Sequence, residues 1–546
     1  MSFNHKQYKP FKPISKSDRR WPNQVIQKAP RYCAVDLRDG NQALASPLNI
    51  EQKKIMFDLL VACGFKEIEV GYPSASTVEF DFCRFLIEGD HVPQNVVIQV
   101  MSPLIREHIK TTFAAVANAS KVIIHLYHPT SSTHRNKVLQ LSQTELLDRV
   151  IQQVTWVKQY AQSFPETQWV FQFSLEHFST TESQYALKVI NSINAIWRPD
   201  QGQSVIFNLP ATVEASTPNG YADQVEWIID HMDHREHCCI SLHTHNDRGC
   251  AVAAAELGVL AGADRVEGTL LGNGERTGNM DLVTFAMNLY SQGIDPKLDF
   301  SDMRKLKDIV ETCIQIKTHV RHPYAGDLVY TAFSGGHQDA IEKCLRHYND
   351  DGPWEVAYIP INPKDTGFSL KDIIRINSQS GKGGLRYILA QQGYPDLPIW
   401  LIEDFARHIQ FQAESLSREI SHQEIKQIFH EMYMMVTDDW RLISYQVEQD
   451  DKAVKVKCFV GLMNDFSYYE GEGDDLKSAI QHALSCSHPE KSITIEAHQS
   501  IQSRTFNGYV LNAIIDSQPI ITLTAGEDKN RVMIQAYFSA LSKVRK

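Results

Sequence analysis

The sequence predicts a (β/α)₈ barrel, a TIM barrel, followed by smaller domains. Three observations favour this fold class. Short apolar segments alternate with amphipathic helical segments from Arg31 onward, the unit recurs eight times, and polar residues gather where the apolar segments end. A chain of 546 residues exceeds one ordinary core, so we expect two to four domains in all.

Composition and charge are those of a globular protein. Hydrophobic residues make up 43% and charged residues 22%, and the formal net charge of −11 leaves no basic face for nucleic acid. The ten cysteines include no Cys-x-x-Cys pair, which indicates a reducing compartment rather than a zinc ribbon or a disulfide framework. No apolar run approaches the ~20 residues of a membrane helix. Residues 1–30 lack the apolar segment of a signal peptide, so we expect no membrane association and a cytoplasmic location.

The first 30 residues are polar and basic. Four prolines interrupt any helix there, namely Pro10, Pro13, Pro22 and Pro30. We expect an arm that lies on the surface of its own chain or on a neighbour.

Eight apolar segments are the predicted barrel strands. They are Tyr32–Asp36, Glu67–Gly71, Val96–Met101, Val122–Leu126, Trp169–Ser174, Ser204–Leu209, Cys239–His243 and Arg265–Leu270. The helical segments between them include Ile50–Cys63, Leu141–Gln162, Gln224–Met232 and Ala251–Ala261. Alternation of this kind implies parallel strands joined by crossover helices.

A doubly wound open sheet is the alternative fold. Such a sheet usually carries a glycine-rich turn after its first strand. Here the corresponding turn is Asp36-Leu37-Arg38-Asp39-Gly40-Asn41-Gln42, which has charges in place of glycines. The barrel is therefore favoured.

Active sites of such barrels lie at the C-terminal ends of the strands. The polar residues at the predicted ends are Arg38, Asp39, Gln42, Glu69, His125, Ser174, Glu176, Asn208, Thr212, His243 and His245, with Pro210 beside them and the loop Gly272–Asn279 after the last strand. Each residue taken alone is more simply a loop residue that satisfies backbone groups. Their joint placement predicts an active site.

The sequence Ser241-Leu242-His243-Thr244-His245 predicts a metal site. Residues two apart in a strand share a face, so both imidazoles would project together, although an isolated His-x-His is often only a polar strand edge. Two imidazoles and a carboxylate, best supplied by Asp39, form a catalytic metal site with open positions, and Asn279 is a further oxygen ligand. These donors suit Mg, Mn or Zn. The ion could polarise the carbonyl of a 2-oxo acid, and Arg38 could stabilise the oxygen unless it only pairs with Asp39.

A set of motifs identifies a known family. The set comprises Asp36–Gln42, Glu69, Leu209-Pro210-Ala211-Thr212-Val213-Glu214, His243–Asp247 and Gly272–Asn279. It resembles the metal-dependent Claisen-condensing barrel enzymes, and among them most closely the long form of the 2-isopropylmalate synthase family. The Arg-Asp pair with a distant Glu marks the superfamily, and Leu-Pro-Ala-Thr-Val-Glu narrows it to this branch. The resemblance extends through nearly the whole chain.

The resemblance implies an acyltransferase of leucine biosynthesis. Its reaction would condense acetyl-CoA with 3-methyl-2-oxobutanoate and hydrolyse the thioester to 2-isopropylmalate. Arg38 would contact the keto oxygen, and Thr212 would contact the substrate carboxylate. Glu176 and Glu275 would lie near the reacting groups, and the resemblance does not assign their individual roles. The residues that would hold the divalent ion are Asp39, His243, His245 and Asn279. Those that would line the isopropyl pocket are His125, Ser174, Asn208 and Pro210.

After Tyr290 the barrel pattern ends. Asp302–Lys317 is a predicted helix, Ser334-Gly335-Gly336-His337 begins another, and Tyr358–Pro363 is expected to be extended. In the family this region is a linker domain that reaches the barrel of the partner subunit. The resemblance therefore implies a homodimer in which His337 and Tyr358 are catalytic, although His337 alone is more simply a surface histidine.

The final segment, from about Thr437, predicts an α+β domain. Val454–Val460 and Ile493–Ala497 alternate as half-buried strands, and helices at Asp475–Leu484 and Arg531–Lys543 each follow strands, which indicates an internal duplication. This resembles the leucine-sensing regulatory domain of the family and implies leucine as an effector. The loop Ser500–Gly508 departs from the small side chains usual there, since it contains Gln502, Arg504, Phe506 and Asn507.

The sequence thus predicts four parts. They are an arm (1–30), a catalytic barrel (31–325), a linker domain (326–436) and a regulatory domain (437–546). Homocitrate synthase and citramalate synthase share the metal set and remain alternatives, as does, more distantly, a metal-dependent aldolase or carboxyl-transferring lyase. A catalytically silent amino-acid sensor is disfavoured, because it would not need to retain Arg38, Asp39, His243 and His245.

Overall fold

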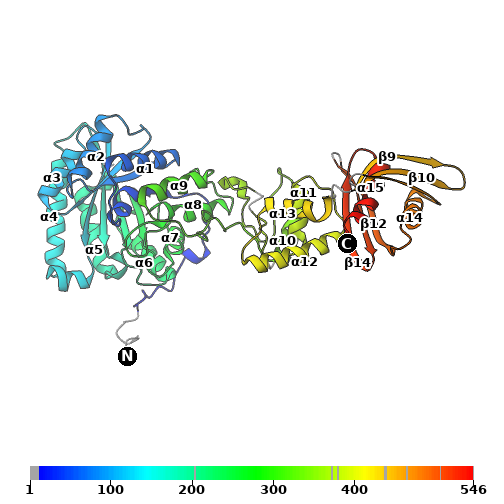
Figure 1. Ribbon diagram of the computed structural model, residues 1–546. Coiled ribbons are helices and arrows are strands. Elements are labelled where there is room, and N and C mark those ends of the chain that lie inside the picture. The colour runs from blue at the N-terminus through cyan, green and yellow to red at the C-terminus, as the bar shows by residue number, and fades with distance from the viewer. Residues whose placement is uncertain are drawn as a thin grey trace, which may run out of the picture. The chain divides into compact units, whose positions relative to one another are not determined.

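The computed structural model describes residues 11–201, 204–369, 373–377, 380–435, 440–462, 465–503 and 506–544. The chain divides into two compact units, Met1–Val329 with Lys364–Phe368, and Tyr330–Pro363 with Ser369–Lys546. Figure 1 labels the helices of both units and some strands of the second unit along the chain. None of the helices in the described ranges is both long and apolar enough to cross a membrane.

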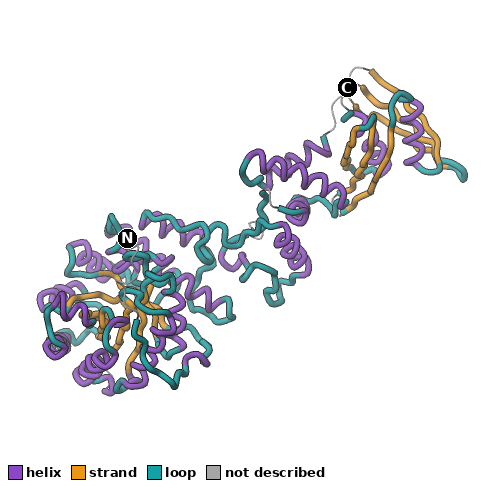
Figure 2. The backbone as a smooth tube through the Cα atoms, turned by 90° about the horizontal axis from the view of Figure 1, so that it is seen from below, coloured by secondary structure: helices purple, strands orange, loops and turns teal. Residues whose placement is uncertain are grey.

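The first unit contains a closed barrel of eight parallel strands, which confirms the predicted fold. The strands follow one another around the barrel in chain order, and the last pairs with the first. Their bounds are β1 (Arg31–Ala34), β2 (Glu67–Gly71), β3 (Val97–Pro103), β4 (Lys121–Pro129), β5 (Gln168–Glu176), β6 (Val205–Ala211), β7 (Cys238–Thr244) and β8 (Arg265–Gly268). Figure 2 shows these strands encircled by helices.

The helices of this unit cover the outside of the barrel. Their bounds are α1 (Ile50–Ala62), α2 (Thr77–Glu88), α3 (Arg106–Ala115), α4 (Gln143–Ala161), α5 (Ser183–Trp197), α6 (Pro218–His231), α7 (Ala251–Leu260), α8 (Leu282–Tyr290) and α9 (Met303–Ile314). Two begin with reciprocal capping, Asn49 with Gln52 for α1 and Ser142 with Glu145 for α4. Helix α6 begins earlier than the predicted Gln224, because Pro218 occupies its first turn, where a missing N–H is tolerated.

The strand ends differ from the prediction in ways that shape the site. Strand β1 ends at Ala34 instead of Asp36, because Asp36–Gly40 forms a buried π-helical turn in which Gly40 N–H donates to Val35 O. Strand β5 continues to Glu176, two residues beyond the predicted end at Ser174. Ser174 and Glu176 therefore alternate on one strand and share a face.

The barrel interior contains a buried polar layer that the sequence prediction missed. Arg265, with no exposed surface, lies at its centre. Its guanidinium donates to Glu67 (2.6 Å), Ser241 (2.8 Å), Glu267 (2.6 Å) and Gln99 (2.8 Å). Burying a charge is tolerated only when it is paired and hydrogen-bonded in this way.

The described part of the N-terminal arm lies on its own barrel. Lys16 Nζ lies 2.7 Å from Asp230 Oδ2, and Arg19 Nε lies 2.7 Å from Asp223 Oδ1. Trp21 donates its indole N–H to the same Asp223 at 2.9 Å. Basic residues of the arm thus pair with acidic residues of α6.

The second unit holds helices and two small sheets. The α-helices described between residues 335 and 429 are α10 (Gly335–His347), α11 (Lys382–Gln391), α12 (Ile399–Leu416) and α13 (His422–Phe429). Ser334 precedes α10 as predicted. Tyr358 is not extended as expected, because it lies in a turn with a left-handed φ of 65°.

The C-terminal part repeats three antiparallel strands and a helix. The first set is β9 (Trp440–Gln449), β10 (Val454–Leu462), β11 (Asp465–Gly473) and α14 (Leu476–Ser487); the second is β12 (Ile493–Gln502), β13 (Asn507–Ile515), β14 (Gln518–Ala525) and α15 (Lys529–Ser542). The sets share one core, to which Val456, Ile480, Leu511 and Ile534 belong. The predicted duplication is confirmed, with three strands in each copy. Thr437 and Arg504, named in the sequence analysis, lie outside the described residues.

Candidate active site

A cavity of about 390 Å³ opens at the C-terminal ends of the barrel strands. The residues that line it are Arg38, Asp39, Gln42, Tyr72, Met101, His125, Tyr127, Ser174, Glu176, His177, Asn208, Pro210, Thr212, Val213, His243, His245, Glu275 and Arg276. Of the barrel residues predicted to bind substrate, to bind metal or to act in catalysis, only Asn279 does not line this cavity. The strand-end rule therefore predicted which residues line this cavity.

Asp39, His243 and His245 form a compact cluster of potential metal ligands. One ligand atom from each lies within 4.8 Å of the other two. Nε2 of His243 and Nε2 of His245 lie 3.3 and 3.7 Å from Oδ2 of Asp39. Asn279 is adjacent, because its backbone bridges to that of His245.

Orphaned polar atoms show that this cluster fits a cation. Oδ2 of Asp39 and Oδ1 of Asn279 are buried and lack a hydrogen bond to any described residue. Leaving buried polar atoms unsatisfied is unfavourable, so such groups are normally satisfied by protein, water or an ion. Two imidazoles with carboxylate and amide oxygens are the donor set of a catalytic divalent metal site.

The two imidazoles have opposite electrostatic environments. Burial lowers the pKa of His243, but the neighbouring carboxylates of Asp39 and Glu267 outweigh burial and raise that pKa to about 9. Burial and the neighbouring His243 lower the pKa of His245 to about 4. Burial opposes ionisation of Asp39, yet Arg38 and His243 hold its pKa well below the usual value. A divalent cation bound here would release the proton of His243, since metal ligands must be deprotonated.

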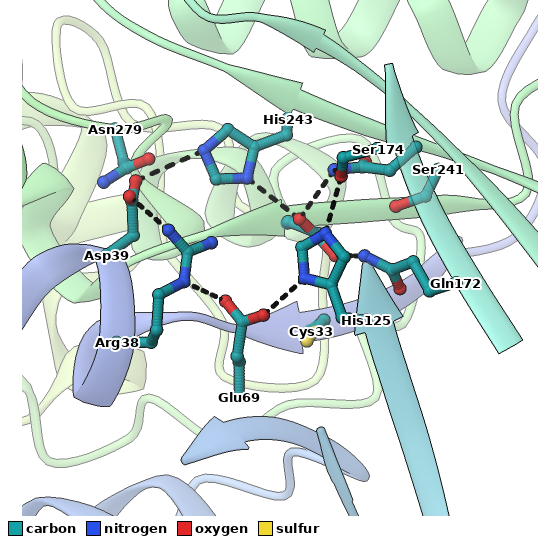
Figure 3. Close-up of polar contacts among 12 residues, drawn as sticks. Cys33, Arg38, Asp39, Glu69, His125, Gln172, Ser174, Ser241, His243 and Asn279 are labelled. Atoms are coloured by element: carbon teal, nitrogen blue, oxygen red, sulfur yellow. Dashed lines mark hydrogen bonds and ion pairs between the residues drawn. The ribbon is translucent and has the colours of Figure 1, made fainter. Parts of the chain in front are cut away.

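Arg38 is held between two carboxylates. Its Nη1 lies 2.5 Å from Oδ1 of Asp39, and its Nε lies 2.5 Å from Oε2 of Glu69. The other oxygen of Glu69 lies 2.6 Å from Nδ1 of His125 (Figure 3). The ion pair with Asp39 considered in the sequence analysis is present, and Arg38 also lines the cavity.

The polar contacts continue from His125 back to His243. Nε2 of His125 lies 2.7 Å from Oγ of Ser174 (Figure 3). Asn208 donates from Nδ2 to Ser174 Oγ (2.9 Å) and to Glu267 Oε2 (3.0 Å). The same oxygen of Glu267 lies 2.9 Å from Nδ1 of His243. These contacts complete a closed ring of eight side chains, which we call the polar ring: Asp39, Arg38, Glu69, His125, Ser174, Asn208, Glu267 and His243.

Thr212 is held at the rim by two neighbouring loops. Its Oγ1 accepts the backbone N–H of His177 at 2.9 Å, which leaves the hydroxyl proton available for another acceptor. Arg276 donates to the carbonyl of Thr212 (2.6 Å) and to Asp247 (2.7 Å). The loop that carries Glu275 and Asn279 is thereby tied to the end of β6.

Glu176 and Glu275 differ in burial. The side chain of Glu176 is half-buried, and burial raises its pKa above the usual value despite the nearby Arg38. Glu275 is exposed at the rim of the cavity. A carboxylate with a raised pKa is the better proton acceptor near neutral pH.

His337 and Tyr358 belong to the second unit. Their rings stack at a centroid distance of 4.0 Å, and both residues are exposed. The stacking keeps together two residues that are 21 positions apart in the sequence.

The sequence analysis missed several lining residues. Tyr72 follows β2, and Met101 and Tyr127 lie in the last three residues of β3 and β4, so the strand-end rule could have included them. His177 and Arg276 lie next to predicted residues. Glu267 gave a weaker signal, a charged residue two positions after Arg265 in a strand that is otherwise apolar.

Comparisons with known proteins agree with this geometry. Residues 29–310 match the HMGL-like family, and residues 327–390 match the post-catalytic domain of alpha-isopropylmalate synthase. The chain is 51% identical to 2-isopropylmalate synthase of Alcanivorax borkumensis over 89% of this chain and 87% of that protein. It is 46% identical to the Ralstonia pickettii enzyme of that name over 88% of this chain and 84% of that protein. It is 42% identical to the Azotobacter vinelandii enzyme of that name over 98% of this chain and 96% of that protein.

Proposed function

The chain belongs to the HMGL-like family and, within it, to the 2-isopropylmalate synthases, and we propose that it condenses acetyl-CoA with 3-methyl-2-oxobutanoate and hydrolyses the thioester to 2-isopropylmalate. This is a transferase reaction of leucine biosynthesis. The observation that carries the proposal is the Asp39, His243 and His245 cluster beside Arg38 in one cavity.

Asp39, His243, His245 and Asn279 would hold a divalent cation, for which Mg, Mn and Zn are candidates. When bound, the ion would act as a Lewis acid on the carbonyl of the 2-oxo acid. Arg38 supplies a fixed positive charge beside the proposed metal ligands, because Asp39 and Glu69 hold its guanidinium on two sides. A preorganised donor of this kind stabilises negative charge that develops on the keto oxygen.

Thr212 is suited to hold the substrate carboxylate. Its hydroxyl oxygen already accepts from His177, so its proton is available for a further acceptor. A hydrogen bond to a charged group contributes about 1.5–3 kcal/mol. Thr212 would thus fix the orientation of the 2-oxo acid.

The proposed side-chain pocket favours a branched apolar group. Its wall consists of His125, Ser174, Asn208 and Pro210, and the polar groups of the first three bond to one another or to Glu69 and Glu267. Few donors remain for the second carboxylate of 2-oxoglutarate, the substrate of homocitrate synthase. Pyruvate would leave the pocket unfilled, which disfavours citramalate synthase.

Glu176 is our candidate for the base that removes a proton from the methyl group of acetyl-CoA. Burial raises its pKa, and it lines the cavity near Arg38. Glu275, at the rim of the cavity, would also take part in catalysis. His337 and Tyr358, stacked in the second unit, would act on the barrel of a partner subunit in a homodimer.

The four-part division of the sequence analysis (1–30, 31–325, 326–436, 437–546) belongs to the same proposal. The C-terminal duplication supports a regulatory domain with leucine as effector. A cytoplasmic location accords with a biosynthetic enzyme of this kind.

The test is thiol release from acetyl-CoA with a panel of 2-oxo acids, followed by identification of the product. We expect the highest specificity constant with 3-methyl-2-oxobutanoate. A higher value with pyruvate or 2-oxoglutarate would assign the protein to citramalate or homocitrate synthesis. Absence of turnover with every oxo acid, in the presence of Mn²⁺ or Mg²⁺, would favour the sensor alternative.

A further inference from the structure

Glu267 pairs with Arg265 at the base of the site, and it also contacts several other side chains. The residue lies in β8 and has no exposed surface. Oε1 accepts from Arg265 Nη1 (2.6 Å), Gln172 Nε2 (2.8 Å) and, at 3.4 Å, Gln99 Nε2. Oε2 accepts from Asn208 Nδ2 (3.0 Å) and lies 2.9 Å from His243 Nδ1.

These contacts make Glu267 an acceptor for N–H groups from five strands. The nitrogens of Arg265, Gln172, Gln99 and Asn208 that face Glu267 can only donate, so the carboxylate acts as an acceptor. The imidazole nitrogen that faces the same carboxylate must therefore carry a proton as well. The Nδ1 proton of His243 is thereby fixed toward Glu267. The lone pair of the neutral ring then lies on Nε2, the nitrogen nearest Asp39.

The same carboxylate fixes one wall of the cavity. Asn208 donates to Glu267 and to Ser174 through one amide nitrogen, so its amide cannot be turned over without facing an oxygen toward a carboxylate. This leaves Oδ1 of Asn208 buried without a hydrogen bond to a described residue. The position of Ser174 and, through it, of His125 follows from the same contact.

We propose that Glu267 is a positioning residue that couples the metal ligand His243 to the oxo-acid pocket. The proposal rests on the function proposed above. It assigns to one buried carboxylate both the tautomer of a metal ligand and the orientation of Asn208. Carboxylates that hold the second nitrogen of a metal-bound histidine typically change metal affinity 10- to 100-fold when they are removed.

Glu67 provides a matched control. It is also a buried glutamate that pairs with Arg265, with Nε of the arginine 2.6 Å from its Oε2. Its side chain bonds to Arg31 and Arg265, and neither is a proposed metal ligand or a residue of the cavity wall. Loss of either glutamate disturbs the buried layer, but only Glu267 contacts His243.

The first experiment measures Mn²⁺ binding to the full-length protein by electron paramagnetic resonance, without substrate. In Glu267→Gln the new amide must face either Arg265 or Asn208 and His243, so a donor opposes a donor in both orientations. We expect the dissociation constant for Mn²⁺ to rise about 10- to 100-fold. In Glu67→Gln, which keeps the His243 contact, we expect a change smaller than about threefold. Equal weakening in both variants, or wild-type affinity in Glu267→Gln, would overturn the proposal.

Circular dichroism and thermal unfolding establish that each variant is folded. If Glu267→Gln does not fold, Glu267→Asp decides, because it keeps the charge for Arg265 and shortens the reach to His243 by one methylene. That variant should weaken Mn²⁺ binding by about three- to tenfold relative to wild type. Unchanged affinity in a folded Glu267→Asp protein would contradict the coupling.

The second experiment distinguishes the effect of Glu267 on the oxo-acid pocket from its effect on metal binding. At saturating Mn²⁺, Glu267→Gln should raise the KM for the preferred 2-oxo acid by about tenfold, while the KM for acetyl-CoA changes by less than about twofold. An equal rise in both would contradict a role in orienting Asn208. Failure of the proposed reaction is distinguishable, since wild-type protein would then show no thiol release while the Mn²⁺ titrations would still report on Glu267.

Discussion

Nε of Arg38 lies 2.5 Å from Oε2 of Glu69, and both side chains are buried at the base of the cavity. Glu69 thus directs the guanidinium, while its other oxygen is occupied by His125. The orientation of Arg38 toward the reacting oxygen therefore depends on a carboxylate in the neighbouring strand.

Glu69→Gln should lower kcat/KM on the order of 10²-fold, because a displacement of about 1 Å at a reacting group has this effect. Steady-state kinetics on folded protein measure the change. Glu256→Gln is the control, since Glu256 accepts from Asn288 between α7 and α8 and does not line the cavity. Equal kinetics in Glu69→Gln and wild type would show that Arg38 does not depend on Glu69.

Replacing one proposed metal ligand should abolish activity as completely as replacing two. His243→Ala and His245→Ala should each reduce turnover to background, and the double variant should be no worse, because residues that act as a unit are non-additive. Chelation should abolish activity and Mn²⁺ should restore it, with the far-ultraviolet dichroism unchanged. His231→Ala, an exposed histidine on α6, is the control. Full activity in the double variant would disprove the metal-site assignment.

Thr212 should act through its hydroxyl. Thr212→Val should raise the KM for the 2-oxo acid about 10- to 100-fold, since it loses a hydrogen bond to a charged group. Thr212→Ser keeps the donor and the acceptor for His177, so its KM should stay close to that of wild type. Similar KM values for the valine and serine variants would place the substrate carboxylate elsewhere.

Catalysis across subunits should be visible by complementation. His337→Ala and His245→Ala proteins should each be inactive, while a co-assembled mixture should regain about one quarter of wild-type activity, because half of the dimers contain one intact site. His245→Ala mixed with Asp39→Ala is the control and should remain inactive, since both residues lie in one barrel. If mixed dimers form without regained activity, His337 does not act on the partner.

Leucine should inhibit the full-length enzyme only weakly. Gln502 ends β12 and Phe506 precedes β13, so both place bulky side chains beside the turn where the resemblance to the family implies small residues. The ring of Phe506 packs edge-on against Tyr394 at 5.8 Å. Deletion of the residues after Thr437 should remove whatever inhibition exists. Initial rates over a leucine titration measure the coupling between effector and substrate, which binding alone does not report. Strong inhibition at micromolar leucine would contradict this reading of the loop.

Local patterns predicted the barrel well. Periodicity located all eight strands, because each alternates with an amphipathic helix, and the strand-end rule placed residues as distant as Arg38 and His245 in one cavity. The exact ends were less predictable. The turn at Asp36–Gly40 depends on a bond from Gly40 N–H to Val35 O that no local pattern indicated.

The polar ring could not be predicted in the same way. Glu267 meets His243, Asn208 and Gln172 only because the barrel closes, and these partners are 24 to 95 positions away in the sequence. In the sequence, Glu267 is only a charged residue inside a short strand, and its partners cannot be read from the local pattern.

The polar ring has a consequence for engineering this protein. Asn208 forms part of the pocket wall and also donates to the carboxylate that holds His243. A designer who replaces Asn208 to admit a larger oxo acid therefore also alters the support of a proposed metal ligand. Substitutions selected for a new substrate should show epistasis with positions 243 and 267, and their rank order should change with the concentration of the divalent cation in the assay.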